Sequence, residues 1–143
     1  MAVQPIPEGQ QSVTPYLVVK DAAALIDFLR RAFDAREMVR HARPDGTIMH
    51  AQIKIGDSVM MMGEPMGDQG TMPAMLHLYV ANVDQVYEQA LAAGATSIMP
   101  PTDQFYGDRS GAVADKHGNH WWIGTHIEDV SKEEMVKRMA AAG

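Results

Sequence analysis

The sequence has no cysteine and few aromatic residues, and both shortages limit the chemistry available to it. Aromatic side chains make up 6% of the 143 residues, and cysteine is absent. Without cysteine the chain can form no disulfide, no thiolate metal site and no cysteine nucleophile. Histidine, aspartate, glutamate and tyrosine are therefore the residues left to carry any chemistry.

Long apolar runs and clusters of positive charge are also missing. No apolar run reaches about 18 residues, and MAVQPIPEGQQ at the start has neither the charged nor the apolar region of a signal peptide. We therefore expect a cytoplasmic protein with no membrane partner. The formal net charge is −6, and no run of lysine and arginine offers the basic face that a phosphate backbone needs. Nucleic acid is therefore not an expected partner.

Hydrophobic residues, at 46% of the chain, suffice for the core of a single globular domain, which we expect to span residues 1–143. The first part predicts the order β-α-β-β-β. A β-rich run at 12–19 ends before Asp21, which is suited to cap a helix near 21–33 with one apolar stripe. Three further strands are predicted, at 36–42, 47–55 and 57–63.

The second part predicts the same order again. MLHLYV is a strand, Asn82 a helix cap, and the helix near 83–93 is stopped by Gly94, after which three more extended segments follow. When the first part is aligned on the second with an offset of 61 residues, Tyr16 falls on His77. An offset of 62 residues is needed for the last strands, where it places Met60 on Trp122.

These patterns divide the chain into two βαβββ modules and a tail. The first module spans about 12–64 and the second about 74–128, with a joint around 65–74. In the tail, Ser131 and Glu134 have the spacing of a capping box, so a short amphipathic helix is expected at about 131–142.

Four segments carry a resemblance to a known family: VTPYLVVKDAAALIDFLRRAF, IMHAQIKIGDSVMMM, LHLYV and QFYGDRSGAVADKHGNHWWI. They resemble the vicinal oxygen chelate superfamily of glyoxalases, extradiol dioxygenases and bleomycin resistance proteins, and most of all its PhnB-like branch. The resemblance covers roughly residues 12 to 128. It implies an α+β fold in which two βαβββ modules form curved mixed sheets around a crevice, the place where a ligand is expected.

The resemblance also implies where a metal would bind. Metal-dependent members carry ligands at positions that fall here on Thr14, Met60, Met75 and Trp122. None of these side chains is a normal ligand for a divalent cation, so we expect no cofactor. The alternative is a divalent metal ion held by His50 and His77, with Glu64 or Asp108 as the carboxylate.

Strand alternation sorts the polar residues of IMHAQIKI. His50, Gln52 and Lys54 share one face. The other face holds the apolar set that should pack under the helices: Met49, Ala51, Ile53 and Ile55. The polar face should therefore line the crevice. We expect the other strands to add Thr14, Tyr16, Met75, His77, Tyr79, His120 and Trp122 to that lining.

The segment QFYGDRSG supplies further candidates. Phe105 and Tyr106 precede Arg109 in a stretch bracketed by two glycines, which can lie over the mouth of a crevice. Arg109 either pairs with Asp108 or Asp115 as a structural contact or receives an oxygen atom of a ligand.

DKHGN, further along, predicts a hairpin turn. HWWI then alternates across the sheet, which sends Trp122 towards the crevice and its neighbour towards the helix.

The leading hypothesis is a small-molecule binding protein of the glyoxalase/bleomycin resistance type, which holds a planar or amphipathic ligand. The alternatives are a metal-dependent lyase, isomerase or dioxygenase that uses His50 and His77, and a metal-free enzyme with one of them as general base. Paired modules leave sheet edges uncovered, so a homodimer is expected. The candidate ligand-binding residues are Tyr16, His50, Gln52, His77, Tyr79, Phe105, Tyr106, Arg109 and Trp122.

Overall fold

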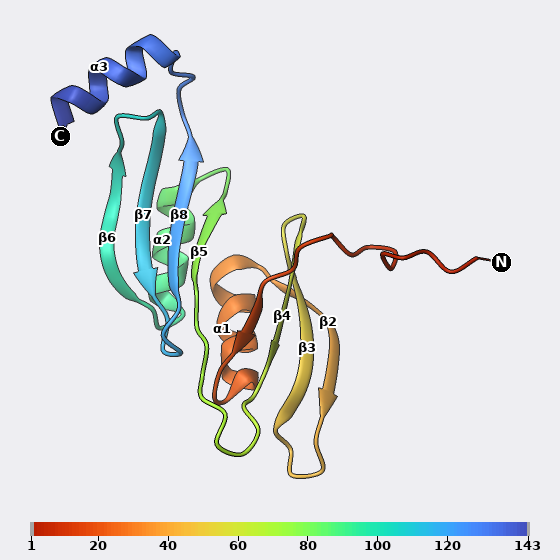
Figure 1. Cartoon of the computed structure of the whole chain (residues 1–143). Helices are drawn as coiled ribbons and strands as arrows, with labels where there is room; N and C mark the ends of the chain where they lie inside the picture. Colours follow the sequence, from red (N-terminus) through yellow and green to blue (C-terminus); the bar gives the residue numbers. More distant parts are fainter. Residues whose placement is uncertain (1, 143) are drawn as a thin grey trace. The chain divides into compact units, whose positions relative to one another are not determined.

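A computed structural model describes residues 2–142 of the chain and contains two compact units that divide between Pro73 and Ala74. Each unit has the order β-α-β-β-β and consists of one four-stranded mixed sheet with a helix against it (Figure 1). The predicted α+β class and the repeated βαβββ order are therefore confirmed.

The sheet of the first unit has the strand order β1-β4-β3-β2, with β1 parallel to β4 and the other pairs antiparallel. Helix α1 places Leu25, Ile26 and Leu29, all fully buried, against one face of this sheet. We call the face opposite the helix the far face. The elements are β1 (Tyr16–Val18), α1 (Ala22–Phe33), β2 (Arg36–Ala42), β3 (Ile48–Ile55) and β4 (Ser58–Gly63).

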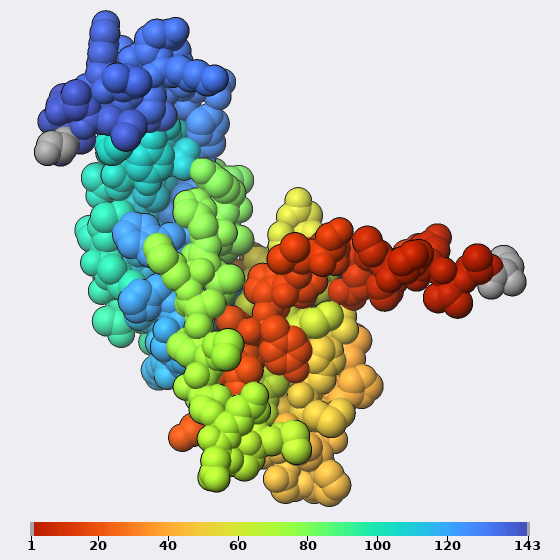
Figure 2. Space-filling model, in the orientation of Figure 1, coloured from red at the N-terminus to blue at the C-terminus, as the bar shows by residue number. Residues whose placement is uncertain are grey.

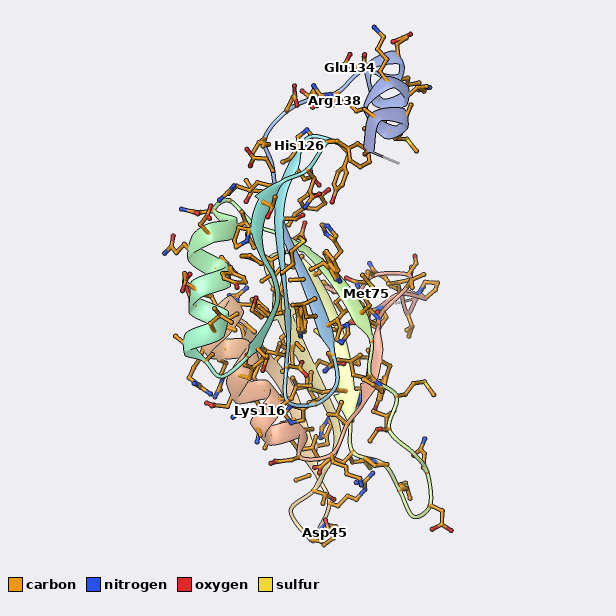
Figure 3. The ribbon with its side chains drawn as sticks, turned by 90° about the vertical axis from the view of Figure 1, so that its left-hand side faces the viewer. Asp45, Met75, Lys116, His126, Glu134 and Arg138 are labelled. Carbon is orange, nitrogen blue, oxygen red and sulfur yellow. The ribbon has the colours of Figure 1, made fainter. Side chains whose placement is uncertain are left out.

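The second unit repeats this topology with the strand order β5-β8-β7-β6. Trp121, Ile123 and Val113 are buried on the side of α2, and Figure 3 shows Met75 on the opposite, far face of the same sheet. The elements are β5 (Met75–Tyr79), α2 (Val83–Ala92), β6 (Thr96–Asp103), β7 (Asp108–Ala114) and β8 (His120–His126).

The two helices begin in different ways. Asn82 caps α2 as predicted, because its side chain accepts a hydrogen bond from the Gln85 N–H at 3.2 Å. The prediction for Asp21 is wrong: this residue has a left-handed backbone with φ of 53°, and its side chain makes no capping bond to α1. Its own N–H donates instead to Oε1 of Glu64 at 3.0 Å. Glu64 therefore anchors the start of α1 from the end of β4.

Strand register gives one offset for the first and last strands of the repeat. Tyr16 lies beside Met61 in the first unit, and His77 lies beside Trp122 in the second. The offset is therefore 61 residues for both strand pairs. The alignment of Met60 with Trp122 is wrong, because Met60 pairs with buried Ile53 on the covered face of its sheet and is itself buried.

Strand β3 departs from simple alternation at Met49. His41 pairs with His50, but Ala42 pairs with Ile48, so Met49 is an extra residue in a β-bulge. The bulge buries Ile48 and leaves the Met49 side chain 52% exposed. The prediction that Met49 packs under the helix with Ala51 and Ile53 is therefore wrong for Met49 and correct for the other two.

The chain ends in α3 (Lys132–Ala142), whose predicted cap is confirmed: the Glu134 N–H donates to Oγ of Ser131 at 3.1 Å. No side chain of α3 is buried. Arg138 attaches the helix to the preceding chain, since it donates to the Phe105 carbonyl oxygen at 2.9 Å and pairs with Glu128. Figure 3 shows Arg138 on α3. No helix within residues 2–142 has the length and apolar content needed to cross a membrane.

Candidate functional site

The far face of the second unit gathers the largest group of polar and aromatic side chains. Trp122 is half-buried on this face, while Trp121 is 2% exposed on the helix side and donates from Nε1 to Asp115 at 2.9 Å. The predicted division between the two tryptophans is confirmed. Strand register adds to the same face Met75, His77, Tyr79, Asp108, Ser110 and His120.

A hydrogen-bonded network runs along one end of this face. The Tyr79 hydroxyl donates to Oδ2 of Asp108 at 2.6 Å, and Nδ1 of His126 lies 2.9 Å from Oδ1 of the same carboxylate. The other ring nitrogen of His126 lies 2.7 Å from Asp129. His126 is the last residue of β8 and pairs with Asp108.

The network shifts the pKa values of its members. Burial raises the pKa of Asp108, but the hydrogen bonds from Tyr79 and His126 outweigh this effect, so the pKa lies below its usual value and the carboxyl is ionised. The hydrogen bonds to Asp129 and Asp108 raise the pKa of His126. The hydrogen bond to Asp108 also raises the pKa of Tyr79, which keeps the phenol protonated.

Two exposed rings on this face can meet a ligand. The ring of His77 lies 4.7 Å from that of Tyr79, and both side chains are exposed. The Tyr79 proton is engaged by Asp108, but its oxygen can still accept a bond. The Ser110 hydroxyl has no hydrogen-bond partner among the described residues, but it is buried beneath the face. The face thus combines ring surfaces for stacking with a phenol oxygen for hydrogen bonds.

The far face of the first unit carries a chain of hydrogen bonds. Gln10 donates from Nε2 to Oε1 of Gln52 at 2.8 Å, and Nε2 of Gln52 lies 3.2 Å from Nε2 of His50. Nδ1 of His50 lies 3.2 Å from the Tyr16 hydroxyl. The N-terminal segment, drawn in red in Figure 2, thereby reaches the yellow strands of this unit, which the sequence did not indicate.

His41 also belongs to this face. Its ring stacks near that of His50 with centroids 6.4 Å apart. The register places His41, on β2, opposite His50 on β3. The pairing of β2 with β3 was the signal that could have identified it.

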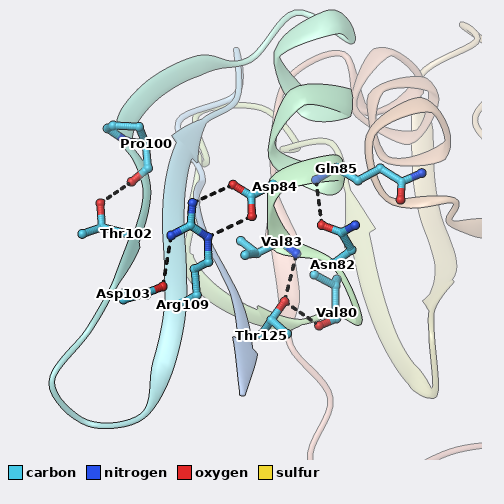
Figure 4. Close-up of polar contacts among 10 residues, drawn as sticks. All are labelled: Val80, Asn82, Val83, Asp84, Gln85, Pro100, Thr102, Asp103, Arg109 and Thr125. Atoms are coloured by element: carbon cyan, nitrogen blue, oxygen red, sulfur yellow. Dashed lines mark hydrogen bonds and ion pairs between the residues drawn. The ribbon is translucent and has the colours of Figure 1, made fainter. Parts of the chain in front are cut away.

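Arg109 pairs with acids other than the two predicted ones. It lies on the side of α2 and makes a two-pronged ion pair with Asp84, at 2.8 and 2.9 Å, and a further one with Asp103 at 3.0 Å (Figure 4). Hydrogen bonds from Arg109 lower the pKa of Asp84. The predicted partners Asp108 and Asp115 are wrong. The guanidinium therefore joins α2 to β6 and β7, which is a structural contact.

Phe105 and Tyr106 lie in the short turn before β7. Their rings meet edge to face with centroids 5.3 Å apart, and both side chains are exposed. Gly107 follows with φ of +97°, and a Cβ there would collide with the carbonyl oxygen of Glu128. This glycine lets the chain beyond β8 pack against the turn.

The side chains at the family's metal positions do not fit a metal ion. With the corrected register these positions are Thr14, Met61, Met75 and Trp122, which offer a hydroxyl, two thioethers and an indole. Such groups are poor ligands for a hard or borderline divalent cation. Among residues 2–142 no three histidine, aspartate or glutamate side chains are grouped to hold a metal.

A family profile matches most of this chain, and a relative matches it over nearly its whole length. The sequence profile of the Glyoxalase/Bleomycin resistance protein/Dioxygenase superfamily matches residues 10–123. The uncharacterized protein Mb0911c of Mycobacterium bovis is 37% identical over 145 residues, which cover 94% of this chain and 95% of that protein.

Two solved structures are similar in fold. TioX from Micromonospora sp. ML1 has a TM-score of 0.69 and 26% identity, with 82% of this chain and 99% of that chain covered. A protein from Bacillus cereus described as a putative 3-demethylubiquinone-9 3-methyltransferase, PhnB protein, has a TM-score of 0.66 and 19% identity, with coverage of 80% and 99%.

Proposed function

Since this chain belongs to the glyoxalase/bleomycin resistance protein/dioxygenase superfamily, we propose that it is a small-molecule binding protein whose ligand stacks on the far face of the second unit. We place it in the PhnB-like branch, on the segments that resemble that branch. The proposal does not require a metal ion.

One observation carries this proposal. Trp122 is half-buried at the centre of a face whose neighbouring strand presents the rings of His77 and Tyr79, and these rings lie 4.7 Å apart. A half-buried indole next to two exposed rings can hold a flat guest by stacking, and the Tyr79 oxygen can fix its orientation by accepting a hydrogen bond. The face is thus better suited to binding than to a metal-centred reaction.

The charge of the chain favours a cationic guest. Its formal net charge is −6, although the Asp108 carboxylate itself is already paired with His126. Flat cations can therefore combine stacking on Trp122 with electrostatic attraction. An anionic guest of the same shape would meet repulsion.

A titration with proflavine, a flat aromatic cation, tests the proposal. We expect saturable binding followed by the fluorescence of the dye, and about tenfold weaker binding to Trp122→Leu because the stacking surface is lost. Ile127→Ala, which changes an exposed apolar side chain just beyond β8, is the control and should bind as the parent does. Equal binding to Trp122→Leu and the parent would reject the proposed face.

Metal removal tests the alternative function. Dialysis against EDTA should leave proflavine binding unchanged, because the proposed contacts involve only protein side chains. If EDTA abolished binding, and a divalent cation restored it, a metal-dependent protein that uses His50 or His77 would replace this proposal. The variants His50→Ala and His77→Ala would then show which histidine the cation needs.

A further inference from the structure

The first unit contains a hollow that the proposed function does not use. It lies at the end of β4, beside the segment that follows this strand, and has a volume of about 190 Å³. In Figure 2 this yellow-green segment lies beside the red residues of β1, consistent with the backbone pairing of Val18 with Met72. The residues that line it are Tyr16, Val18, Arg43, Met49, Gly63, Glu64, Met66 and Gln69.

Arg43 brings unpaired positive charge to the hollow. Its Nη1 donates to Oγ1 of Thr47 and its Nη2 to the carbonyl oxygen of Glu64, both at 3.1 Å. Two of the five N–H groups of the guanidinium are thereby used, and no ion pair of Arg43 with a carboxylate occurs within residues 2–142. Glu64 also lines the hollow, but its two carboxylate oxygens accept from the backbone N–H groups of Asp21 and Ile48, and its side chain forms no ion pair with Arg43 among the described residues.

Tyr16 brings a second donor. If the Gln52 amide donates to Nε2 of His50, the neutral imidazole carries its proton on Nδ1 and donates it to the Tyr16 oxygen. The phenol proton of Tyr16 is then free to point into the hollow. The hydrogen-bond chain that starts at Gln10 therefore ends with a donor at the hollow wall.

Two methionines give the hollow an open apolar rim. Met49 and Met66 are 52% and 66% exposed, and the bulge in β3 is what presents Met49 at the surface. A Cβ at Gly63 would lie 2.5 Å from the Met49 carbonyl oxygen and 2.9 Å from the Tyr16 hydroxyl. Only glycine therefore fits at this position in the lining of the hollow. Flexible thioethers on the rim can adapt to differently shaped apolar groups.

We propose that this hollow binds a small organic carboxylate with a short apolar body. Arg43 and Tyr16 donate to the carboxylate, and the apolar body packs against Met49 and Met66. The hollow is smaller than the roughly 300–1,000 Å³ of pockets for drug-sized ligands, so a compact acid is the matching class. The inference goes beyond the proposed function, because it names a separate site of opposite charge preference, and it holds whether or not proflavine binds.

NMR of the full chain with ¹³C-methyl-labelled methionine tests the inference directly. The probe is 4-methylpentanoate, and its neutral analogue of the same shape is 4-methylpentanamide. We expect saturable shifts of the Met49 and Met66 methyl signals with the carboxylate, at least tenfold weaker binding of the amide, and no shift at Met72. Equal affinity for acid and amide, or shifts spread over all methionines, would overturn the inference.

Matched variants locate the site. Met66→Glu places a carboxylate on the rim and should weaken 4-methylpentanoate binding at least tenfold, whereas Met72→Glu, at 65% exposure in the same connecting segment, should not. Arg43→Met should weaken binding to the level of the amide, while Arg36→Met, on exposed β2, makes the same change of net charge and should have no effect. Met66→Glu and Met72→Glu both retain the Arg43 contacts, so the comparison of these two variants tests the site even if Arg43→Met fails to fold. Equal affinities for Met66→Glu and Met72→Glu would contradict the site.

Discussion

The Tyr79 hydroxyl donates a 2.6 Å hydrogen bond to the carboxylate of Asp108, which is 3% exposed although it stands at the beginning of a strand. A buried carboxylate is costly unless its oxygens are hydrogen-bonded. Tyr79 and His126 each supply a bond to one oxygen atom. The phenol is therefore both a structural partner of Asp108 and a ring on the proposed binding face.

Replacing Tyr79 by phenylalanine should destabilise the protein while it keeps the ring. The Asp108 carboxylate would lose one of its two side-chain donors, at a cost of about 1–3 kcal/mol in the free energy of unfolding. Urea denaturation measures this loss. Tyr106→Phe, which removes an exposed hydroxyl from the turn before β7, should change the free energy by much less. A Tyr79→Phe variant as stable as the parent would show that Asp108 finds another donor.

The Asp108–His126 pair should make stability depend on pH. The pKa of Asp108 is lowered from 3.8, so its contribution is present above that value and is lost as the pH falls through the lowered pKa. The pKa of His126 is raised from 6.5, so its contribution is full below 6.5 and is lost as the pH rises through the raised pKa. The pair contributes most between these two ordinary values.

Thermal melting of His126→Gln tests this dependence. The difference in Tm from the parent should be largest between pH 3.8 and 6.5 and should shrink on either side. His120→Gln, an exposed histidine on the same strand, is the control and should give a difference that does not follow this profile. A constant difference for His126→Gln from acid to alkaline pH would refute the ion pair.

The two tryptophans should differ sharply in their effect on stability. Trp121→Phe removes an indole that is 2% exposed and donates to Asp115, so we expect a loss of about 1–3 kcal/mol in the free energy of unfolding from the missing donor alone. Trp122→Phe removes a half-buried ring from the far face and should cost less. Denaturation in urea compares them. If Trp122→Phe were the more destabilising change, the assignment of the two faces would have to be reversed.

We propose that the protein is a homodimer in solution. In each unit the sheet has its helix on one side only. Each sheet also has two edge strands with a single neighbouring strand within the unit, namely β1 and β2 in the first unit and β5 and β6 in the second. Apolar side chains also remain exposed on the far faces, among them Met75 and Tyr79. Light scattering should give twice the mass of one chain. The mass of a single chain across a wide range of concentrations would disprove this expectation.

Local sequence signals were enough to predict the elements and their order. Asn82 and Gly94 mark the ends of α2, and strand alternation correctly separated Trp121 from Trp122. These features depend on residues close together in the chain, where turn chemistry and side-chain period act directly. The fold could therefore be predicted from the sequence almost completely.

Long-range partners could not be predicted in the same way. Arg109 has acidic neighbours at 108 and 115, yet its partners are Asp84 on α2 and Asp103 on β6, because alternation turns it away from Asp108. The bulge at Met49 likewise depends on how β2 pairs with β3. Both contacts are set by strand register, which a single sequence leaves open.

The offset of 61 residues for the first and last strands means that these parts of the two halves share a backbone that carries different side chains. Where the first half has Tyr16 and Met61, the second has His77 and Trp122. A duplicated scaffold of this kind can change its chemistry in one copy while the other is left as it was, since each copy keeps its own core. Exchanging these pairs between the halves would transfer the ring surfaces from one unit to the other while the backbone stays the same. The exchanged protein and the parent would then differ only in which unit carries the recognition chemistry.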